Sequence, residues 1–317
     1  MGTKVLIAED LWWKVPTGFA ERYHVVYEPG LVHDRARLLQ SGQDTAALVV
    51  RNRTRVDSEL LTQFPSLKVV GRLGVGLDNI HLDACRDRGV QVVAAKGCNA
   101  VSVAEYVTAC LFHHARFLHQ SDGSVRGGRW DRQGATGFEV FGKTMGLVGV
   151  GDIGHRVAIR AKALGLRILA YDPFVLPTSP LVQDLGVELA QLNAVLEQAH
   201  YVSVHVPLTP ETRHMIGEGQ LQLMRADAVL INTSRGGVVD EDALAVKLAK
   251  HPASVAYLDV REHEPPRDGD DLAQFPNVVS TPHVAGITKE SSQRVAAFVL
   301  AQVDAVLRGE PAQGSVI

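Results

Sequence analysis

The chain has 317 residues, of which 46% are hydrophobic and 21% charged, and its formal net charge is −3 at pH 7. This length suits two domains, each with its own core. The charge is not basic enough for a general nucleic-acid binder, and no apolar stretch approaches the roughly 20 residues that span a bilayer. We therefore expect neither nucleic acid nor a membrane as a partner.

Cysteine and histidine placement argues against a structural metal or a disulfide framework. Cys85, Cys98 and Cys110 are odd in number and lack the spacing of metal ligands. His113 and His114 are neighbours on a predicted helix, where adjacent side chains point in different directions. The N-terminal Lys4–Ala8 run is predicted to be a buried strand and not a signal peptide, because charged residues follow it at once. A cytoplasmic protein without a metal is expected.

Short β-rich runs alternate with helix-length amphipathic segments along most of the chain. This alternation predicts the α/β class, with parallel sheets covered by helices on both faces. In the first third, helices are predicted at Ser58–Phe64 and Leu82–Arg88. The predicted strands there are Val5–Ala8, Tyr23–Tyr27, Ala46–Val50, Leu67–Val70 and Val90–Ala94.

A long helical segment, Ser102–Gln120, separates this block from the rest, and the polar, glycine-rich stretch Ser121–Gly137 that follows it is predicted to be an exposed loop. The alternation then restarts, which predicts a second α/β domain. The last segment, Ser291–Leu307, is an amphipathic helix that we expect to return and pack on the first block. The predicted strands of the second block are Thr144–Val150, Arg167–Tyr171, Tyr201–Val206, Ala228–Asn232, Val255–Val260 and Val278–Ser280.

A G-x-G-x-x-G motif lies between a predicted strand and the predicted helix His155–Leu164. The motif alone is weak, but the strand–turn–helix context is that of a dinucleotide site. Its first glycine allows the tight turn, its second lets the backbone approach a pyrophosphate, and its third lets helix and strand pack closely. The phosphates would lie at the helix N-terminus. The predicted binding residues are Gly149, Gly151, Asp152, Ile153 and Gly154.

Asp172 ends the next predicted strand, 18 residues after Gly154. A carboxylate there can accept hydrogen bonds from both hydroxyls of the adenosine ribose and would repel a 2′-phosphate, which predicts NAD and not NADP. The alternative is a turn residue before Pro173. An earlier Gly74-Val75-Gly76 sequence lacks the third glycine and is interpreted as a turn.

Three further segments follow predicted strands, where open α/β sheets bind ligands. Arg235 precedes two glycines, and its guanidinium could clamp a carboxylate and polarise a neighbouring carbonyl. The acidic segment Leu258–Pro266 and the segment Ser280–Gly286, which contains His283, are the other two. Each alone has a structural alternative: a surface arginine, an acidic loop, or a histidine buried beside a proline turn.

In their order along the chain, these segments resemble the signature blocks of the D-isomer-specific 2-hydroxyacid dehydrogenase family, which includes phosphoglycerate dehydrogenases and D-lactate dehydrogenases. The resemblance covers nearly the whole chain. The matching blocks are Val49-Val50-Arg51, Gly71–Ile80, Asn99–Glu105, the glycine motif, His205–Thr209, the arginine and acidic segments, and Thr281-Pro282-His283.

The resemblance implies a catalytic role for three residues. His283 resembles the acid/base of the family, Glu264 the carboxylate that hydrogen-bonds it, and Arg235 the arginine that binds the substrate and polarises its carbonyl. Glu262 is a rival for the carboxylate, but the spacing from Asp259 favours Glu264. A histidine suits this chemistry because it titrates near neutrality, so it can donate a proton to the alkoxide in reduction and accept one in oxidation.

The remaining site residues follow from the same resemblance. The backbone of the Gly74–Gly76 turn, with Val75 and Gly76, is implied to bind the substrate carboxylate, and Arg51 and Asn99 are implied to lie near the substrate. Residues implied to line the cofactor are His205, Pro207, Thr233, Asp259 and Gly286.

The family inserts its nucleotide domain into its substrate domain, which accounts for the mid-chain position of the glycine motif. We therefore expect two doubly wound parallel-sheet domains: a flavodoxin-like substrate domain of residues 1–100 and 286–317, interrupted by a Rossmann NAD domain of residues 101–285. The family also implies a homodimer formed through the nucleotide domain, with Ser102–Trp130 as the helix and arm involved.

The sequence does not identify which 2-hydroxy acid is the substrate. Arg51, Arg53 and Arg55 would share one face of a strand-like segment, which indicates a second anionic group such as that of phosphoglycerate, sulfolactate or a malate-like acid. The alternative is a solvated basic loop. Other activities considered are a glyoxylate/hydroxypyruvate reductase and an NADH-sensing co-regulator. Phosphite and formate enzymes are disfavoured, because they carry a lysine in place of Val75 and an amide in place of Glu264 respectively.

Overall fold

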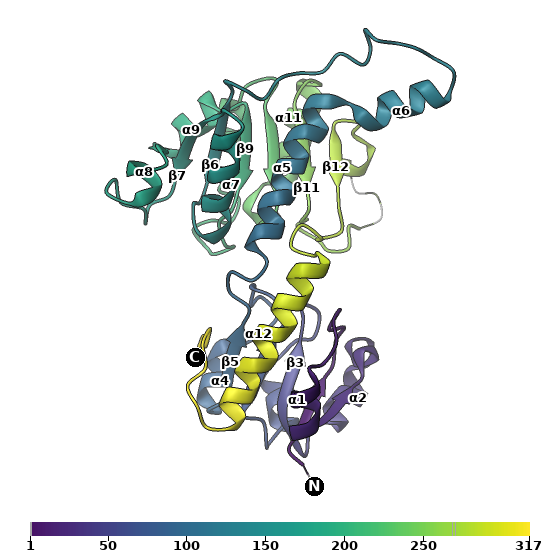
Figure 1. Cartoon of the computed structure of the whole chain (residues 1–317), viewed down its shortest axis with the longest axis vertical. Coiled ribbons are helices and arrows are strands. Elements are labelled where there is room, and N and C mark those ends of the chain that lie inside the picture. The colour runs from purple at the N-terminus through teal and green to yellow at the C-terminus, as the bar shows by residue number, and fades with distance from the viewer. Residues whose placement is uncertain (1, 268, 270) are drawn as a thin grey trace. The chain divides into compact units, whose positions relative to one another are not determined.

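The computed structural model describes residues 2–267, 269 and 271–317. The chain divides into two compact units (Figure 1). One comprises the chain up to Asn99 together with Ile287–Ile317, and the other is Ala100–Gly286. Each boundary lies one residue from the expected position.

The first unit contains a five-stranded parallel sheet in the order β2-β1-β3-β4-β5, the order of flavodoxin-like folds. All five strands lie within two residues of the predicted runs. The elements are β1 (Lys4–Ile7), α1 (Thr17–Arg22), β2 (His24–Tyr27), the 3-10 helix η1 (Pro29–His33), α2 (Arg35–Gln40), β3 (Thr45–Val50), α3 (Ser58–Gln63), β4 (Val69–Arg72), α4 (Leu82–Asp87), β5 (Gln91–Ala94) and α12 (Lys289–Leu307).

Helix α12 packs on β3, β4 and β5, so the prediction that the terminal helix returns to the first block is confirmed (Figure 1). Gly71 of β4 allows helix α12 to approach the sheet closely. A Cβ atom there would lie 2.8 Å from Val299 Cγ1 and 2.9 Å from Val303 Cγ2. A glycine in this strand therefore lets the valines of the helix fill the space next to the sheet.

The second unit contains a seven-stranded sheet in the order β12-β11-β10-β9-β6-β7-β8, with every pair parallel. The strand order reverses between β6 and β9, as in Rossmann folds. The elements are α5 (Ala100–Arg116), α6 (Leu118–Arg126), β6 (Thr144–Val148), α7 (Asp152–Ala163), β7 (Arg167–Tyr171), α8 (Pro180–Gln183), β8 (Glu188–Leu189), α9 (Leu192–Gln198), β9 (Tyr201–Val204), α10 (Glu218–Leu223), β10 (Val229–Asn232), η2 (Gly236–Val238), α11 (Glu241–Lys250), β11 (Val255–Leu258), η3 (Asp271–Gln274) and β12 (Val278–Ser280).

The region after residue 116 differs from the prediction. The single helix expected at Ser102–Gln120 breaks at Phe117, whose φ is +41°, and α6 then continues to Arg126 into the segment predicted as a loop. The prediction of a loop was wrong for residues 121–126. The cause is that α6 contains only two apolar side chains, Leu118 and Val125, and both are exposed, so the segment lacks the apolar run of a buried helix. An Asp122–Arg126 ion pair of 2.7 Å supports it along its exposed surface. Within the described ranges, no helix combines the length and apolarity needed to cross a membrane.

Candidate functional site

The predicted cofactor and catalytic residues of the second unit all follow strands of its sheet. Because these strands are parallel neighbours, their carboxyl ends meet at one edge, which is where ligands bind in such folds. Arg235 follows β10, Glu264 lies in the segment after β11, and His283 follows β12. The cofactor residues are Gly149, Gly151, Asp152, Ile153 and Gly154 after β6, Asp172 after β7, His205 and Pro207 after β9, Thr233 after β10, Asp259 after β11 and Gly286 after β12.

The glycine turn after β6 is shaped as a phosphate cradle. Gly149 has φ +91°, and a Cβ atom on it would lie 2.9 Å from the carbonyl oxygen of His205. A Cβ atom on Gly154 would lie 2.2 Å from the carbonyl oxygen of Gly149, so these two positions exclude any side chain. Gly151, in contrast, faces open space, and α7 begins at the next residue. The free amides at the start of α7 can therefore meet a pyrophosphate.

Asp172 makes the turn contact and also reaches the glycine turn. Its Oδ1 accepts a hydrogen bond from the Phe174 amide at 2.9 Å, which is the turn contact, and its Oδ2 accepts one from the Val150 amide of the glycine turn at 2.9 Å. A carboxylate has about four acceptor positions, so both oxygens keep lone pairs for ribose hydroxyls. The carboxylate thus ties the glycine turn to the end of β7.

Two buried polar atoms of predicted cofactor residues lack hydrogen-bond partners within the described part of the chain, namely His205 Nδ1 and Thr233 Oγ1. The other nitrogen of His205 lies 2.9 Å from Ser203 Oγ. Burial lowers the pKa of His205 to about 3, so its imidazole is uncharged at neutral pH. Unsatisfied buried groups are uncommon in proteins, and a bound ligand is one group that can satisfy them. Together with the glycine cradle, they fit NAD.

His283 and Glu264 make the contact that the sequence predicts. His283 Nδ1 lies 2.8 Å from Glu264 Oε2, and the other Glu264 oxygen accepts a hydrogen bond from the Arg261 amide at 3.2 Å. Burial acts to raise the pKa of Glu264, but the hydrogen bond and charge of His283 and the positive charge of Arg235 outweigh it, so the pKa is lowered. An ionised Glu264 holds a proton on Nδ1 of the imidazole, which leaves Nε2 to exchange a proton with a substrate.

The rival carboxylate, Glu262, is directed elsewhere. Its Oε1 lies 3.0 Å from His214 Nε2 and accepts a hydrogen bond from the Glu241 amide at 3.2 Å. The spacing argument that favoured Glu264 over Glu262 therefore agrees with the contacts in the structure.

Two features of the sequence bring the arginine and acidic segments together. A Cβ atom on Gly236 would lie 1.9 Å from the carbonyl carbon of Arg261, so only glycine allows the two segments to touch. The buried Arg261 guanidinium also forms two hydrogen bonds with Glu241, of 3.0 and 2.9 Å, at the start of α11. No sequence motif indicates this ion pair. It fixes the loop that carries Glu264.

The predicted substrate residues all lie in the first unit, after neighbouring strands: Arg51 and Arg53 after β3, Val75 and Gly76 after β4, and Asn99 after β5. Val75 is 41% exposed, as a binding turn requires. The Asn99 side-chain oxygen is buried and lacks a hydrogen-bond partner among the described residues.

The expectation that Arg51, Arg53 and Arg55 line one face of a strand-like segment was wrong. Strand β3 ends at Val50, and residues 51–55 turn around the carboxylate of Glu9, which is 4% exposed. Glu9 accepts hydrogen bonds from the amides of Arg51, Arg53 and Thr54 at 2.9, 3.4 and 2.9 Å. These bonds curl the backbone, so side chains no longer alternate. The only sequence signal for Glu9 was a carboxylate directly after a buried strand.

The two first arginines of this segment have different surroundings. The Arg51 guanidinium lies 3.5 Å from the centre of the Trp12 ring and donates hydrogen bonds to the carbonyls of Asp10 and Leu11. Burial lowers the pKa of Arg51 to about 10, so it remains charged at neutral pH. Arg53 is exposed, and its side chain makes no hydrogen bond or ion pair with any residue that the structure describes.

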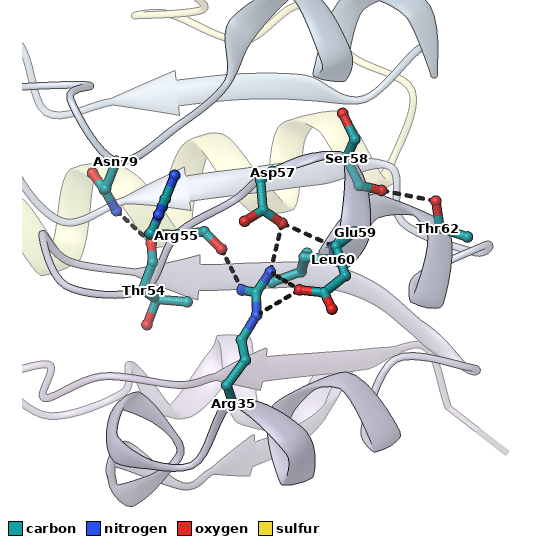
Figure 2. A network of polar contacts seen from close by, with 9 residues as sticks. All are labelled: Arg35, Thr54, Arg55, Asp57, Ser58, Glu59, Leu60, Thr62 and Asn79. Atoms are coloured by element: carbon teal, nitrogen blue, oxygen red, sulfur yellow. Dashed lines mark hydrogen bonds and ion pairs between the residues drawn. The ribbon is translucent and has the colours of Figure 1, made fainter.

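An ion-pair network supports the same segment from α2 (Figure 2). The Arg35 guanidinium points between Asp57 and Glu59 and also donates a hydrogen bond to the Arg55 carbonyl at 2.6 Å. On the other side, the Asn79 amide donates to the Thr54 carbonyl at 2.6 Å and to the Arg51 carbonyl at 3.2 Å. The segment 51–57 is therefore held at both ends before any ligand binds.

Comparisons with known proteins agree with this site. Residues 108–285 match the family model described as D-isomer specific 2-hydroxyacid dehydrogenase, NAD binding domain. The chain is 46% identical over 291 residues to an (S)-sulfolactate dehydrogenase of Chromohalobacter salexigens, covering 92% of this chain and 94% of that one. It is 38% identical to a D-3-phosphoglycerate dehydrogenase of Methanocaldococcus jannaschii, covering 99% of this chain but only 59% of that longer one.

Among solved structures, the crystal structure of a D-lactate dehydrogenase from Aquifex aeolicus complexed with NAD and lactic acid is similar, with a TM-score of 0.83 and 27% identity over 97% of this chain and 96% of that one. A Rossmann unit with a glycine cradle and a histidine–carboxylate pair defines an NAD-dependent oxidoreductase that acts on CH–OH groups. The chain belongs to the D-isomer-specific 2-hydroxyacid dehydrogenase family.

Proposed function

We propose that this chain interconverts a doubly anionic D-2-hydroxy acid and its 2-keto acid, and that a sulfolactate is the first candidate. The observation that carries the proposal is the likeness to a sulfolactate dehydrogenase over almost the full length of both chains. The free guanidinium of Arg53, next to an Arg51 that the protein itself holds in place, supports a second anionic group on the substrate.

In this proposal, Arg235 binds the substrate carboxylate and polarises the carbonyl that becomes the alcohol. His283 gives the proton from Nε2 to the forming alkoxide, while Glu264 stabilises the imidazolium through Nδ1. In the opposite direction the neutral imidazole takes the alcohol proton. NAD, when bound, supplies the hydride-transfer chemistry. The turn Gly74–Gly76 and Asn99 complete substrate binding, so the first unit acts as the substrate domain and the second holds the cofactor.

The stereochemistry of the candidate is consistent with the family. In sulfolactate the sulfur-bearing carbon outranks the carboxylate, whereas in lactate the carboxylate outranks the methyl group. The (S) descriptor of sulfolactate therefore denotes the same spatial arrangement as D-lactate. A D-specific site accepts both without any change of handedness.

A reductase assay with NADH tests the function. We expect sulfopyruvate to give a higher kcat/KM than pyruvate, hydroxypyruvate, phosphohydroxypyruvate and oxaloacetate. In the same assay, His283→Ala should abolish turnover and leave the Kd for NADH nearly unchanged, because it removes only the proton donor. Faster turnover of hydroxypyruvate or glyoxylate would instead favour the reductase alternative, and loss of NADH binding in His283→Ala would overturn the role of this residue.

Arg53→Ala tests the second anionic site. We expect kcat/KM for sulfopyruvate to fall roughly 10- to 100-fold, the range for a lost hydrogen bond to a charged group, with little effect on pyruvate. Arg37→Ala is the matched control, since Arg37 is an exposed arginine of the same unit that pairs with Glu28. Equal losses for both keto acids, or an equal effect of Arg37→Ala, would contradict a specific contact.

We also propose a homodimer and a cytoplasmic location. The dimer is supported by apolar side chains on the surface of the second unit, including Leu118 and Trp130, which are 73% and 80% exposed. The location stays a prediction from the sequence, which cell fractionation would test.

A further inference from the structure

His283 has an unusual backbone conformation. Its φ is +56°, in the left-handed region that is unfavourable for residues with a side chain. Its amide donates hydrogen bonds to the carbonyl oxygens of Asp259 at 2.8 Å and Thr281 at 2.9 Å. A residue in this region persists only where its surroundings hold it, so the groups around Asp259 and Thr281 decide where the imidazole points.

The Asp259 carboxylate surrounds the His283 turn with hydrogen bonds. Asp259 is 1% exposed, and its Oδ1 accepts from Thr281 Oγ1 at 2.6 Å and from the Val284 amide at 2.8 Å. Its Oδ2 accepts from the Ala285 amide at 2.8 Å. These donors lie on both sides of His283 in the chain. The carboxylate therefore holds the turn in place through its hydrogen bonds, a role beyond the cofactor contact that the sequence predicts for it.

The proton positions in this cluster can be assigned. The Thr281 hydroxyl has a single proton, which it donates in the hydrogen bond to the Asp259 carboxylate. The contact of 2.6 Å between Thr281 Oγ1 and the Tyr106 hydroxyl must then be donated by Tyr106. Tyr106 lies on α5. Burial raises the pKa of Tyr106, so its proton stays on the phenol at neutral pH.

We propose that Tyr106 is a positioning residue for the reaction: the chain from Tyr106 to Thr281 to Asp259 fixes the strained turn that carries His283. This inference rests on the proposed role of His283 as the acid/base. Because the Thr281 hydroxyl accepts one of these hydrogen bonds and donates the other, each bond orients and polarises the next. Without the phenol proton, Thr281 can rotate, its bond to Asp259 weakens, and the imidazole loses its fixed position relative to Glu264.

Tyr106→Phe is the direct test, with Tyr201→Phe as the matched control. Both substitutions delete a phenol hydroxyl of the second unit, from a half-buried Tyr106 and a buried Tyr201, but the Tyr201 hydroxyl lacks a hydrogen-bond partner among the described residues. We expect Tyr106→Phe to lower kcat roughly tenfold, since misplacing a catalytic group by a fraction of an ångström has effects of this order. KM for the keto acid and Kd for NADH should change less than about twofold, because the binding groups are untouched. Tyr201→Phe should leave all three values unchanged.

Thr281 provides a second, independent pair of variants. Thr281→Val removes the hydroxyl at nearly constant shape and should lower kcat at least as far as Tyr106→Phe. Thr281→Ser keeps the hydroxyl and should restore most of the activity. Thermal midpoints measured alongside exclude a general loss of folding.

The results separate this inference from the proposed function. If kcat of Tyr106→Phe equals that of Tyr201→Phe, or if the loss appears in KM or in NADH binding, Tyr106 does not position the acid/base. If Thr281→Ser is as impaired as Thr281→Val, the hydroxyl chain is not the cause. If His283→Ala retains turnover, the assignment of His283 itself fails, whatever the Tyr106 variants show.

Discussion

His205 shows how one residue can make the stability of this protein depend on pH. Burial lowers its pKa to about 3, compared with about 6.5 in an unfolded chain. Between these values the unfolded chain binds a proton that the folded protein does not. The stability that comes from keeping His205 neutral is therefore fully present above pH 6.5 and is lost as the pH falls from there toward 3.

We expect His205→Asn to reduce the acid sensitivity of the protein in the absence of NAD. From pH 6.5 to pH 5, one such proton costs up to about 2 kcal/mol, at about 1.4 kcal/mol per pH unit. Free energies of unfolding from urea titrations at pH 7 and pH 5 measure this. His114 and His200 also have pKa values lowered by burial, so part of the pH dependence should remain in the variant. An unchanged pH dependence would show that His205 is not kept neutral.

Residues whose roles follow from their place after a strand could be predicted, whereas residues recruited by distant contacts could not. His283 and Glu264 were identified from their order among the family blocks, and the structure brings them to 2.8 Å. Tyr106 lies 175 residues from Thr281 in the sequence, and Glu9 lies 45 from Thr54. No local pattern links such pairs, because the pairing is created by the way the strands and helices pack.

Among the elements, the buried strands could be predicted because their apolar runs are long enough to be distinct. β8 has only two residues and was missed. α6 was missed because it buries nothing in this chain. A helix with apolar side chains that the chain itself does not cover indicates a partner surface.

The dimer proposal makes a prediction for α6. Leu118→Asp places a charge at the start of this helix, where desolvation would oppose a contact with a second copy, and we expect the variant to be monomeric by light scattering. Phe174→Asp is the control, because Phe174 is 92% exposed but lies outside the predicted dimer segment Ser102–Trp130, and this variant should remain dimeric. A monomeric wild-type protein, or a dimeric Leu118→Asp variant, would contradict the proposal.

At the scale of the whole molecule, each unit has its own hydrophobic core. The first is built around residues such as Leu48 and Val299, and the second around residues such as Leu147 and Val204. The glycine cradle belongs entirely to the second unit. Binding of NAD should therefore act first on the stability of that unit.

We expect NADH to slow amide hydrogen exchange mainly in residues 100–286. At a free concentration of about 100 times Kd, the gain in stability is about 2.7 kcal/mol, which corresponds to roughly 100-fold slower exchange of the amides that exchange only on unfolding of this unit. Peptides from β1–β5 should show little change with NADH alone. Equal protection of both units would mean that they unfold together, and protection confined to the first would refute the assignment of the NAD domain.

The hydrogen bonds of the Glu9 carboxylate determine when the loop after β3 becomes ordered. Three amides converging on one point form a receptor for an anion, and here the protein fills that receptor with an anion of its own. The loop that presents Arg53 is consequently folded before a substrate arrives. The entropy lost in ordering this loop is therefore a cost of folding and not of binding. If Arg53 binds the second anionic group as proposed, its attraction to the substrate is not offset by the cost of ordering the loop, which raises both affinity and selectivity among acids.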